Sequence, residues 1–270
     1  MKKVRITLIV ISVLILLGTI GMTAFWLFSN YRNVRLFKQA QNNFLKGDAP
    51  SLESAEAQLL QLVRNDADNE AAYIMLGQIA EKRKVYPEQI FYCYKAHRLN
   101  PLSAENKERY IQSLLFAREF ERLENLLLQE STLSDKHKEL LFYVSGRNGT
   151  LQKHKALLKL PHTKGLARLA HLLFNSPELD ARKKLSILEK EFPSPEPFLK
   201  QELLNALAEL SLTEELMDQT EKYLLKAYAL NEYAFAPALG GFYANFRTFR
   251  QALQVFEKYL ATYHDQAIAL

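Results

Sequence analysis

The side chains best able to do chemistry are few and widely spaced. Histidine and cysteine, the residues that most often bind metals or act as base and nucleophile, are represented by six histidines and one cysteine, Cys93. The histidines are His97, His137, His154, His162, His171 and His264. None lies four residues from another, and no HExxH, GxSxG, P-loop or GxGxxG motif occurs. The sequence therefore predicts no catalytic residues, no metal site and no cofactor.

The composition favours an all-helical protein. Hydrophobic residues make up 48% and charged residues 24% of the 270 positions, which is typical of a folded domain. Glycine and proline are scarce, at nine each, and helix-forming residues fill long stretches. The net charge is +5, but no basic stripe is interleaved with aromatic residues, so nucleic-acid binding is not expected.

Residues 6–28 form an apolar segment without any charged side chain. As a helix rising 1.5 Å per residue, this segment would reach roughly 34 Å, enough to cross the hydrocarbon core of a bilayer. Aromatic residues that favour the membrane–water interface, such as Trp26 and Tyr31, cluster at its far end. We therefore expect a short tail over residues 1–5 and a transmembrane helix over residues 6–28.

The alternative for this segment is a cleaved signal peptide. Signal peptides have an apolar region of about 7–15 residues and a cleavage site of small residues, whereas this run is longer and ends in bulky rings. The segment therefore favours an uncleaved anchor in the cell membrane. Basic residues flank both of its sides, so the positive-inside rule does not decide the orientation. The short tail favours an N-terminus inside the cell and a periplasmic location for the rest of the chain.

Two distant segments of the chain follow one template. Residues 73–77 read Tyr-x-x-Leu-Gly and residues 236–240 read Ala-x-x-Leu-Gly. Nine residues after the glycine, the two segments carry Tyr86 and Phe249. In paired helices, such a glycine lets the neighbouring helix approach closely and the aromatic residue fills the turn. The chain therefore contains an internal repeat.

This template resembles the tetratricopeptide repeat, whose signature is W-x2-L-G-x2-Y…A-x3-F…P over about 34 residues. Phe120 lies 34 residues after Tyr86, as the next repeat would require, and Pro101 closes the first one. The resemblance implies an α-solenoid of stacked helix pairs. It places Cys93, which replaces the aromatic residue of the signature, between two helices as a buried thiol. Gln89 replaces the usual alanine.

Departures from the signature are many, and none of its tryptophans is present. Residues 134–200 show helical patterns without a clean signature. Helix periodicity and the Gly and Pro breaks predict about seven helix pairs, in two parts that span residues 32–193 and 195–270. The predicted pairs span residues 32–67, 68–101, 103–132, 134–160, 162–193, 195–231 and 233–264.

In the resembling family, the first helix of each pair lines a groove that holds partner peptides. Matched residue by residue, the groove here is lined by Ala71, Ile74, Gln78, Glu81, Glu105, Glu108, Arg109, Gln112, Ala234, Pro237, Gly241 and Asn245. From these we predict as partner-binding residues Gln78, Glu81, Glu108, Arg109, Gln112 and Asn245, together with Phe242 and Phe246. For each of these residues, an exposed helix position that binds no ligand is an equally good interpretation. The basic clamp that chaperone-binding members use for a C-terminal carboxylate is absent.

The last predicted helix pair is rich in aromatic residues, more than one pair can bury by itself. These residues are Tyr233, Phe235, Phe242, Tyr243, Phe246, Phe249, Phe256, Tyr259 and Tyr263. A terminal repeat normally presents a polar outer face. We therefore expect this pair to dock on another subunit or on a partner protein.

Together these features predict a membrane-anchored, non-enzymatic adaptor or scaffold that binds protein partners in a bacterial envelope complex, with a role in assembly, translocation or export. One alternative is a non-catalytic subunit, or a glycan- or lipid-handling solenoid, of an envelope biosynthesis or export machine. Another is an enzyme whose chemistry lies in residues 134–200, which would require polar groups that converge in a pocket.

Overall fold

Capping residues mark the starts of several helices. The side chains of Asp48, Asn69, Ser103 and Ser134 each accept a hydrogen bond from the backbone N–H three residues later, at 2.9 to 3.2 Å. This contact satisfies an N–H group that the first helical turn leaves unpaired. Local residue choice therefore sets where these helices begin.

The computed structural model describes residues 2–160, 165–191 and 196–263, without the side chains of residues 2–17, 24–26, 155, 158 and 191. The described residues form thirteen α-helices and one 3-10 helix, η1. In chain order they are α1 (Lys2–Lys46), α2 (Ala49–Asn65), α3 (Glu70–Arg83), α4 (Tyr86–Leu99), α5 (Ala104–Phe116), α6 (Phe120–Leu128), α7 (Asp135–Arg147), η1 (Leu151–Lys159), α8 (Gly165–Phe174), α9 (Ala181–Glu191), α10 (Pro197–Thr213), α11 (Met217–Leu230), α12 (Glu232–Phe246) and α13 (Phe249–Tyr263).

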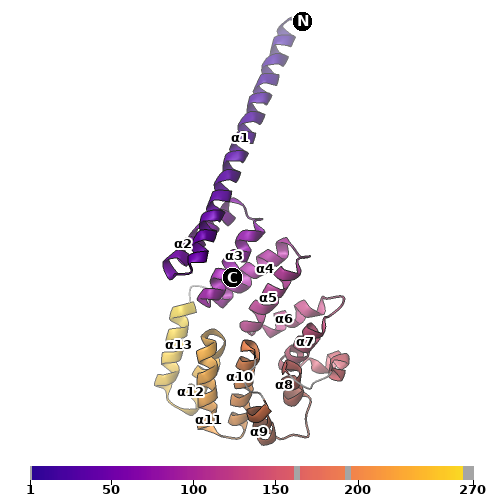
Figure 1. Cartoon of the computed structure of the whole chain (residues 1–270), viewed down its shortest axis with the longest axis vertical. Coiled ribbons are helices and arrows are strands. Elements are labelled where there is room, and N and C mark those ends of the chain that lie inside the picture. Colours follow the sequence, from indigo (N-terminus) through magenta and orange to yellow (C-terminus); the bar gives the residue numbers. More distant parts are fainter. Residues whose placement is uncertain (1, 161–164, 192–195, 264–270) are drawn as a thin grey trace.

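Successive helices stack side by side into a curved array (Figure 1). The all-α prediction is confirmed, and α3/α4, α5/α6, α10/α11 and α12/α13 form helix pairs near the expected places. A Cβ atom on Gly240 would lie 2.5 Å from the ring of Phe256, which shows the close approach that the template predicts. The predicted division at residues 193–195 lies outside the described residues and stays a prediction.

The middle of the array departs from the predicted pairing. The second half of the predicted pair 134–160 is the short 3-10 helix η1, and α7 also packs against α8. A Cβ atom on Gly146 in α7 would overlap the ring of Phe174 in α8. Gly146 therefore has the role of the template glycine. Its partner ring, Phe174, lies 28 residues later in the sequence, whereas Phe256 lies 16 residues after Gly240, because η1 is inserted between α7 and α8.

Helix α1 runs without a break from the N-terminal residues into the first repeat (Figure 1). Its C-terminal part packs on α2 and fully buries Ala40, whereas the rest projects beyond the other helices. Within the side chains that the structure describes, we find no helix that combines the length and the apolar character needed for a membrane span. Most of the predicted span, namely residues 6–17 and 24–26, has side chains outside that description.

The far end of the array curls back on its first half. The rings of Tyr233 in α12 and Tyr86 in α4 lie 5.5 Å apart between centroids, and Asn231 donates a hydrogen bond of 2.8 Å to the carbonyl oxygen of Phe116. Fully buried Phe235 lies under the guanidinium of Arg118, 5.0 Å away. The chain itself therefore buries much of the aromatic excess of its last helix pair. Phe246 and Phe249 stay exposed, at 46% and 77%.

Candidate partner-binding site

Five of the predicted partner-binding residues line one hollow between α3, α4 and α5. This cavity, the α3–α5 hollow, has a volume of about 150 Å³. Its lining consists of Ile74, Gly77, Gln78, Glu81, Gln89, Cys93, Glu108, Arg109 and Gln112. The residues come together because α3 and α5 are first helices of consecutive pairs and α4 lies between them.

Arg109 is the cation of this hollow, and its charge is already balanced. Its Nη2 atom donates to Glu105 Oε1 at 2.8 Å, one helical turn earlier. The side-chain amide of Gln78 has its oxygen oriented toward Arg109. This oxygen accepts hydrogen bonds from Nη1 and Nη2 of Arg109 at 3.1 and 3.2 Å. The guanidinium is therefore held in one place by the two neighbouring first helices.

Glu108 is likewise surrounded by donors. Gln112 Nε2 donates to it at 2.9 Å, Lys136 Nζ at 2.5 Å, and His137 Nε2 lies 3.3 Å away. Burial raises the pKa of this carboxyl, but the hydrogen bonds from Lys136, Gln112 and His137 outweigh it and lower the pKa below its ordinary value. Glu108 is therefore an ionised and paired group at neutral pH.

Gln89 and Cys93, both from α4, form the buried wall of the hollow. Cys93 is 7% exposed, as predicted, and burial raises the pKa of its thiol to about 11, so it stays protonated at neutral pH. Gln89 is 5% exposed, and its Oε1 atom has no hydrogen-bond partner among the described residues. Sequence reasoning did not select Gln89 for binding. Its signal was a polar residue where the repeat signature has alanine.

The other three predicted residues line a second cavity, the α10–α12 hollow, of about 280 Å³. Its lining consists of Arg118, Asn205, Ala208, Glu209, Leu212, Thr220, Leu224, Ala238, Gly241, Phe242, Asn245 and Phe246. Phe242 is buried and Phe246 is half-exposed, with 5.6 Å between their ring centroids. Exposed Asn245 donates a hydrogen bond to the carbonyl oxygen of Gly241 in its own helix at 2.9 Å. The surface of this hollow is mostly apolar.

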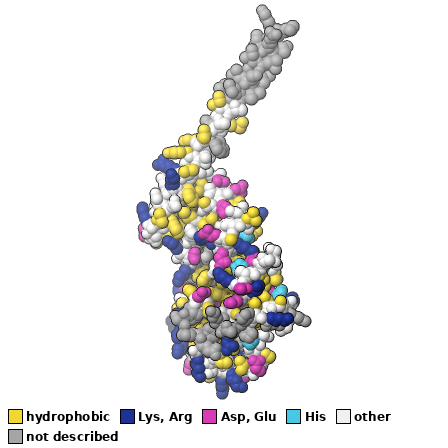
Figure 2. All heavy atoms as spheres, turned by 45° about the vertical axis from the view of Figure 1, so that its right-hand side comes forward, with side chains coloured by type: hydrophobic (Ala, Val, Ile, Leu, Met, Phe, Trp, Pro, Cys, Tyr) yellow, Lys and Arg dark blue, Asp and Glu magenta, His cyan; other side chains and the backbone are white. Residues whose placement is uncertain are grey.

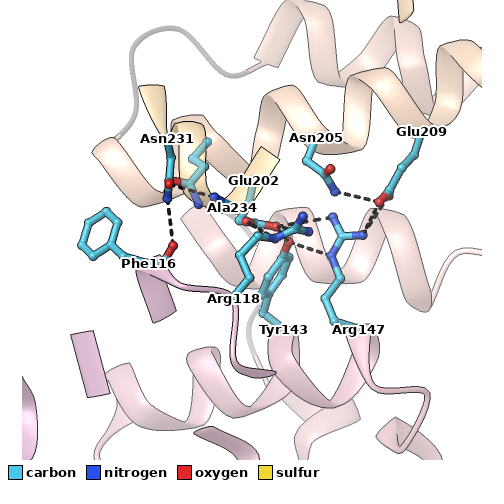
Figure 3. A network of polar contacts seen from close by, with 10 residues as sticks. Phe116, Arg118, Tyr143, Arg147, Glu202, Asn205, Glu209, Asn231 and Ala234 are labelled. Carbon is cyan, nitrogen blue, oxygen red and sulfur yellow. Dashed lines mark hydrogen bonds and ion pairs between the residues drawn. The ribbon is translucent and has the colours of Figure 1, made fainter. Parts of the chain in front are cut away.

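A buried polar network lies beside the second hollow (Figure 3). Glu202 of α10 is fully buried, its Oε1 lies 3.1 Å from Arg118 Nε, and Tyr143 donates its hydroxyl proton to Oε2. Arg147 of α7 donates to Tyr143 at 2.8 Å and to both carboxylate oxygens of Glu209. Burial, followed by the charge of Glu202, raises the pKa of Tyr143 far above its ordinary value. The network therefore holds a neutral phenol and two ion-paired arginines, which tie α7 and the α5–α6 turn to α10.

Other predicted groove residues are dispersed. Ala71 and Pro237 are exposed and line neither hollow, and Glu105 also lies outside both but pairs with Arg109. Within the described part of the chain, no group of three or more His, Cys, Asp or Glu residues is arranged to hold a metal ion. His162 and His264 lie outside the described residues.

Comparison with known proteins finds resemblance at the level of three-dimensional structure. No protein-family model matches the chain, and no curated protein is significantly similar in sequence. A tetratricopeptide repeat protein from Parabacteroides merdae ATCC 43184 is similar in structure, with a TM-score of 0.49 and 16% identity over 86% of this chain and 93% of that one.

Two chains from larger assemblies are also similar. One comes from the Naa15/Naa10 complex bound to HypK-THB, with a TM-score of 0.44, 14% identity and coverage of 84% of this chain and 37% of that one. The other comes from the APC/C hetero-tetramer Cut9–Hcn1, with a TM-score of 0.37, 14% identity and coverage of 89% and 52%. This chain thus spans about a third to a half of the length of those two. Its likeness to all three lies in the arrangement of the helices.

Proposed function

We propose that this protein is a membrane-anchored, non-catalytic scaffold that holds protein partners against its helical repeats, with the repeats on the periplasmic side of a bacterial cell membrane. The anchor is the apolar stretch of α1 over residues 6–28, and the binding surface is the set of side chains that line the two hollows. The role belongs to the assembly, translocation or export work of an envelope complex.

The observation that carries this proposal is the exposed apolar surface of α1 where it leaves the repeats. Ile20, Met22, Leu27 and Phe28 are 55–69% exposed, and no other described part of the chain covers them (Figure 2). An apolar surface of this kind is costly in water, whereas lipid acyl chains would cover it. The contact of α1 with α2 then fixes the repeats to the anchor without a flexible linker.

The binding half of the proposal is supported by the repeats themselves. Five side chains chosen from the repeat spacing line the α3–α5 hollow. Asn245, chosen in the same way, lines the α10–α12 hollow together with Phe242 and Phe246. Concave sites with a few convergent polar groups are the usual places where ligands bind.

Membrane extraction tests the anchor. Full-length protein is expected to stay in the membrane pellet after an alkaline carbonate wash, and a variant with Ile20, Leu27 and Phe28 all changed to Ser is expected to be partly released. Protease added to spheroplasts should digest the repeats if they are periplasmic. Full-length protein that is washed off, or that is digested only after the cells are lysed, contradicts the proposal.

Site-specific crosslinking in native membranes tests the scaffold role. A photocrosslinker at Gln112 or Asn245 is expected to capture a discrete protein partner, whereas one at exposed Glu178, outside both hollows, is not. Equal capture from all three positions would contradict a binding role for the hollows.

A further inference from the structure

The α3–α5 hollow contains a buried hydrogen-bond acceptor without a donor. Gln89 is 5% exposed, and its Oε1 atom has no partner among the residues that the structure describes. Native proteins rarely leave such an atom unpaired, because a buried polar group without a hydrogen bond is costly. Since Gln89 also lines the cavity, a ligand with an N–H donor would supply the missing partner.

The unpaired charge of the hollow is negative. Glu108 is paired with Lys136 and His137, and Arg109 is paired with Glu105 through Nη2, while its buried Nε atom has no acceptor among the described residues. The exposed carboxylate of Glu81 lies at the rim and forms no ion pair within the described part of the chain. A donor that enters the hollow is therefore favoured by charge when it is a cation.

Apolar groups lie next to these acceptors. Ile74 is partly buried and lines the cavity, and Cys93 contributes a protonated thiol that is 7% exposed. Gly77 also lines the cavity and packs closely on α4, since a Cβ atom there would lie 3.2 Å from Cys93 Sγ. A long aliphatic stem with a charged end fits this combination, because the stem can pack on apolar surface while its end group pairs with oxygen atoms.

We propose that the α3–α5 hollow binds a basic side chain, lysine or arginine, from an extended segment of a protein partner. The cationic end donates to Gln89 Oε1 and is balanced by Glu81, and the aliphatic stem lies against Ile74 and Gly77. This inference rests on the proposed scaffold function and names the chemistry of the partner. It also assigns Gln89 a binding role.

Peptide binding to the full-length protein in zwitterionic detergent micelles tests this assignment. The probe is a fluorescein-labelled peptide of twelve residues, glycine and serine with four lysines, with both ends blocked. Fluorescence anisotropy at physiological salt should show that it binds at least tenfold more tightly than the same peptide with Nε-acetyl-lysines. A version with four glutamates should not bind measurably.

Variants locate the binding in the hollow. Gln89→Met and Glu81→Gln are each expected to weaken lysine-peptide binding three- to tenfold. Glu178→Gln is the matched control, because it removes the same charge from an exposed acid outside the hollow. Glu81 is exposed, so Glu81→Gln tests the site without affecting the core. If the acetylated peptide binds equally well, or if both variants bind like Glu178→Gln, the assignment is overturned.

The crosslinking experiment separates this inference from the scaffold proposal. If wild type and both hollow variants capture the same partner equally, the scaffold role stands and the basic-side-chain site is wrong. If the lysine peptide binds in a manner that depends on Gln89 and Glu81 while no partner is captured in membranes, the site stands and the scaffold role fails.

Discussion

Two buried polar residues of this protein, Glu202 and Gln89, have opposite surroundings. Glu202 lies among Arg118, Tyr143 and Arg147, and each of these neighbours is an ion-pair or hydrogen-bond partner (Figure 3). Gln89 is almost as deeply buried, yet its side-chain oxygen has no partner in the described structure. Both lie in helices of the same repeat architecture.

This difference indicates which buried polar groups stabilise the fold and which are available to bind a ligand. A buried charge with its partners in place stabilises one arrangement of helices, and the loss of a partner leaves an uncompensated charge. A buried amide without a partner destabilises the free protein, and a ligand can recover that energy. Mutations of the two sites should therefore change stability in opposite directions.

The largest effect is expected at Glu202. Glu202→Gln leaves Arg118 and Arg147 near a neutral amide, and we expect the free energy of unfolding to fall by about 3 kcal/mol. Urea titration followed by circular dichroism measures this loss. The matched control is Glu209→Gln, since Glu209 also pairs with Arg147 but its side chain is 52% exposed, and it should cost less than about 1 kcal/mol. Equal losses in both variants would show that burial of the pair does not matter.

The same kind of comparison can be made for helix packing, at glycines whose Cβ position is occupied by a neighbouring side chain and at one where it is free. Gly240→Ala places a Cβ atom against the ring of Phe256, and Gly146→Ala places one against Phe174, so each should cost about 2 kcal/mol. Gly241→Ala is the control, because nothing lies within 4 Å of its Cβ position, and it should be neutral or slightly stabilising.

Gly77→Ala introduces a Cβ atom at the α3–α5 hollow, 3.2 Å from Cys93 Sγ, and its loss in the free energy of unfolding should lie between those of Gly240→Ala and Gly241→Ala. The same unfolding titrations rank the four variants.

Glu124 is a second buried carboxylate, both of whose oxygens accept hydrogen bonds, and it should make stability depend on pH. Burial raises its pKa, but hydrogen bonds from Thr150, Asn148 and Ser145 outweigh burial and lower the pKa below the ordinary value of 4.5. The folded protein therefore binds the proton less readily than the unfolded chain. The stability that Glu124 contributes is fully present above about pH 4.5 and is lost as the pH falls through its folded pKa.

Thermal unfolding of wild type and Glu124→Gln between pH 7 and pH 3 measures this contribution. The gap between the two proteins should be widest at neutral pH and should close in acid. A gap that stays constant over this range would mean that Glu124 titrates alike in the folded and unfolded states.

The smallest effect, and the one of opposite sign, is expected at Gln89. Gln89→Met removes the unpaired acceptor and keeps a side chain of similar length, so we expect a gain of about 1 kcal/mol in the free energy of unfolding. Asn106→Leu is the control, because Asn106 is also buried but donates hydrogen bonds to Glu70 Oε1 at 2.6 Å and to the carbonyl oxygen of Ala96 at 3.2 Å. That variant should lose stability. A loss at Gln89 as well would place it with Glu202 as a structural residue.

The features that the sequence determined by itself are local. Helix propensity, the capping residues Asp48 and Asn69, and the spacing from Leu-Gly to the loop aromatic predict helices and pairs because each signal acts within one or two turns. The first-helix positions of the repeat then place Gln78 and Arg109 on one surface. These parts could be predicted because the repeat copies the same short-range geometry.

Only the tertiary structure decided which distant residues meet. Gly146 pairs with Phe174 across the 3-10 helix, Tyr143 lies 59 residues from Glu202, and Asn231 lies 115 residues from Phe116. The contacts of Tyr143 and Asn231 leave no periodic signal, because they depend on the accumulated curvature of several helix pairs and not on any one pair. The same curvature covers Tyr233 and Phe235, whose aromatic rings in the sequence alone predicted a partner.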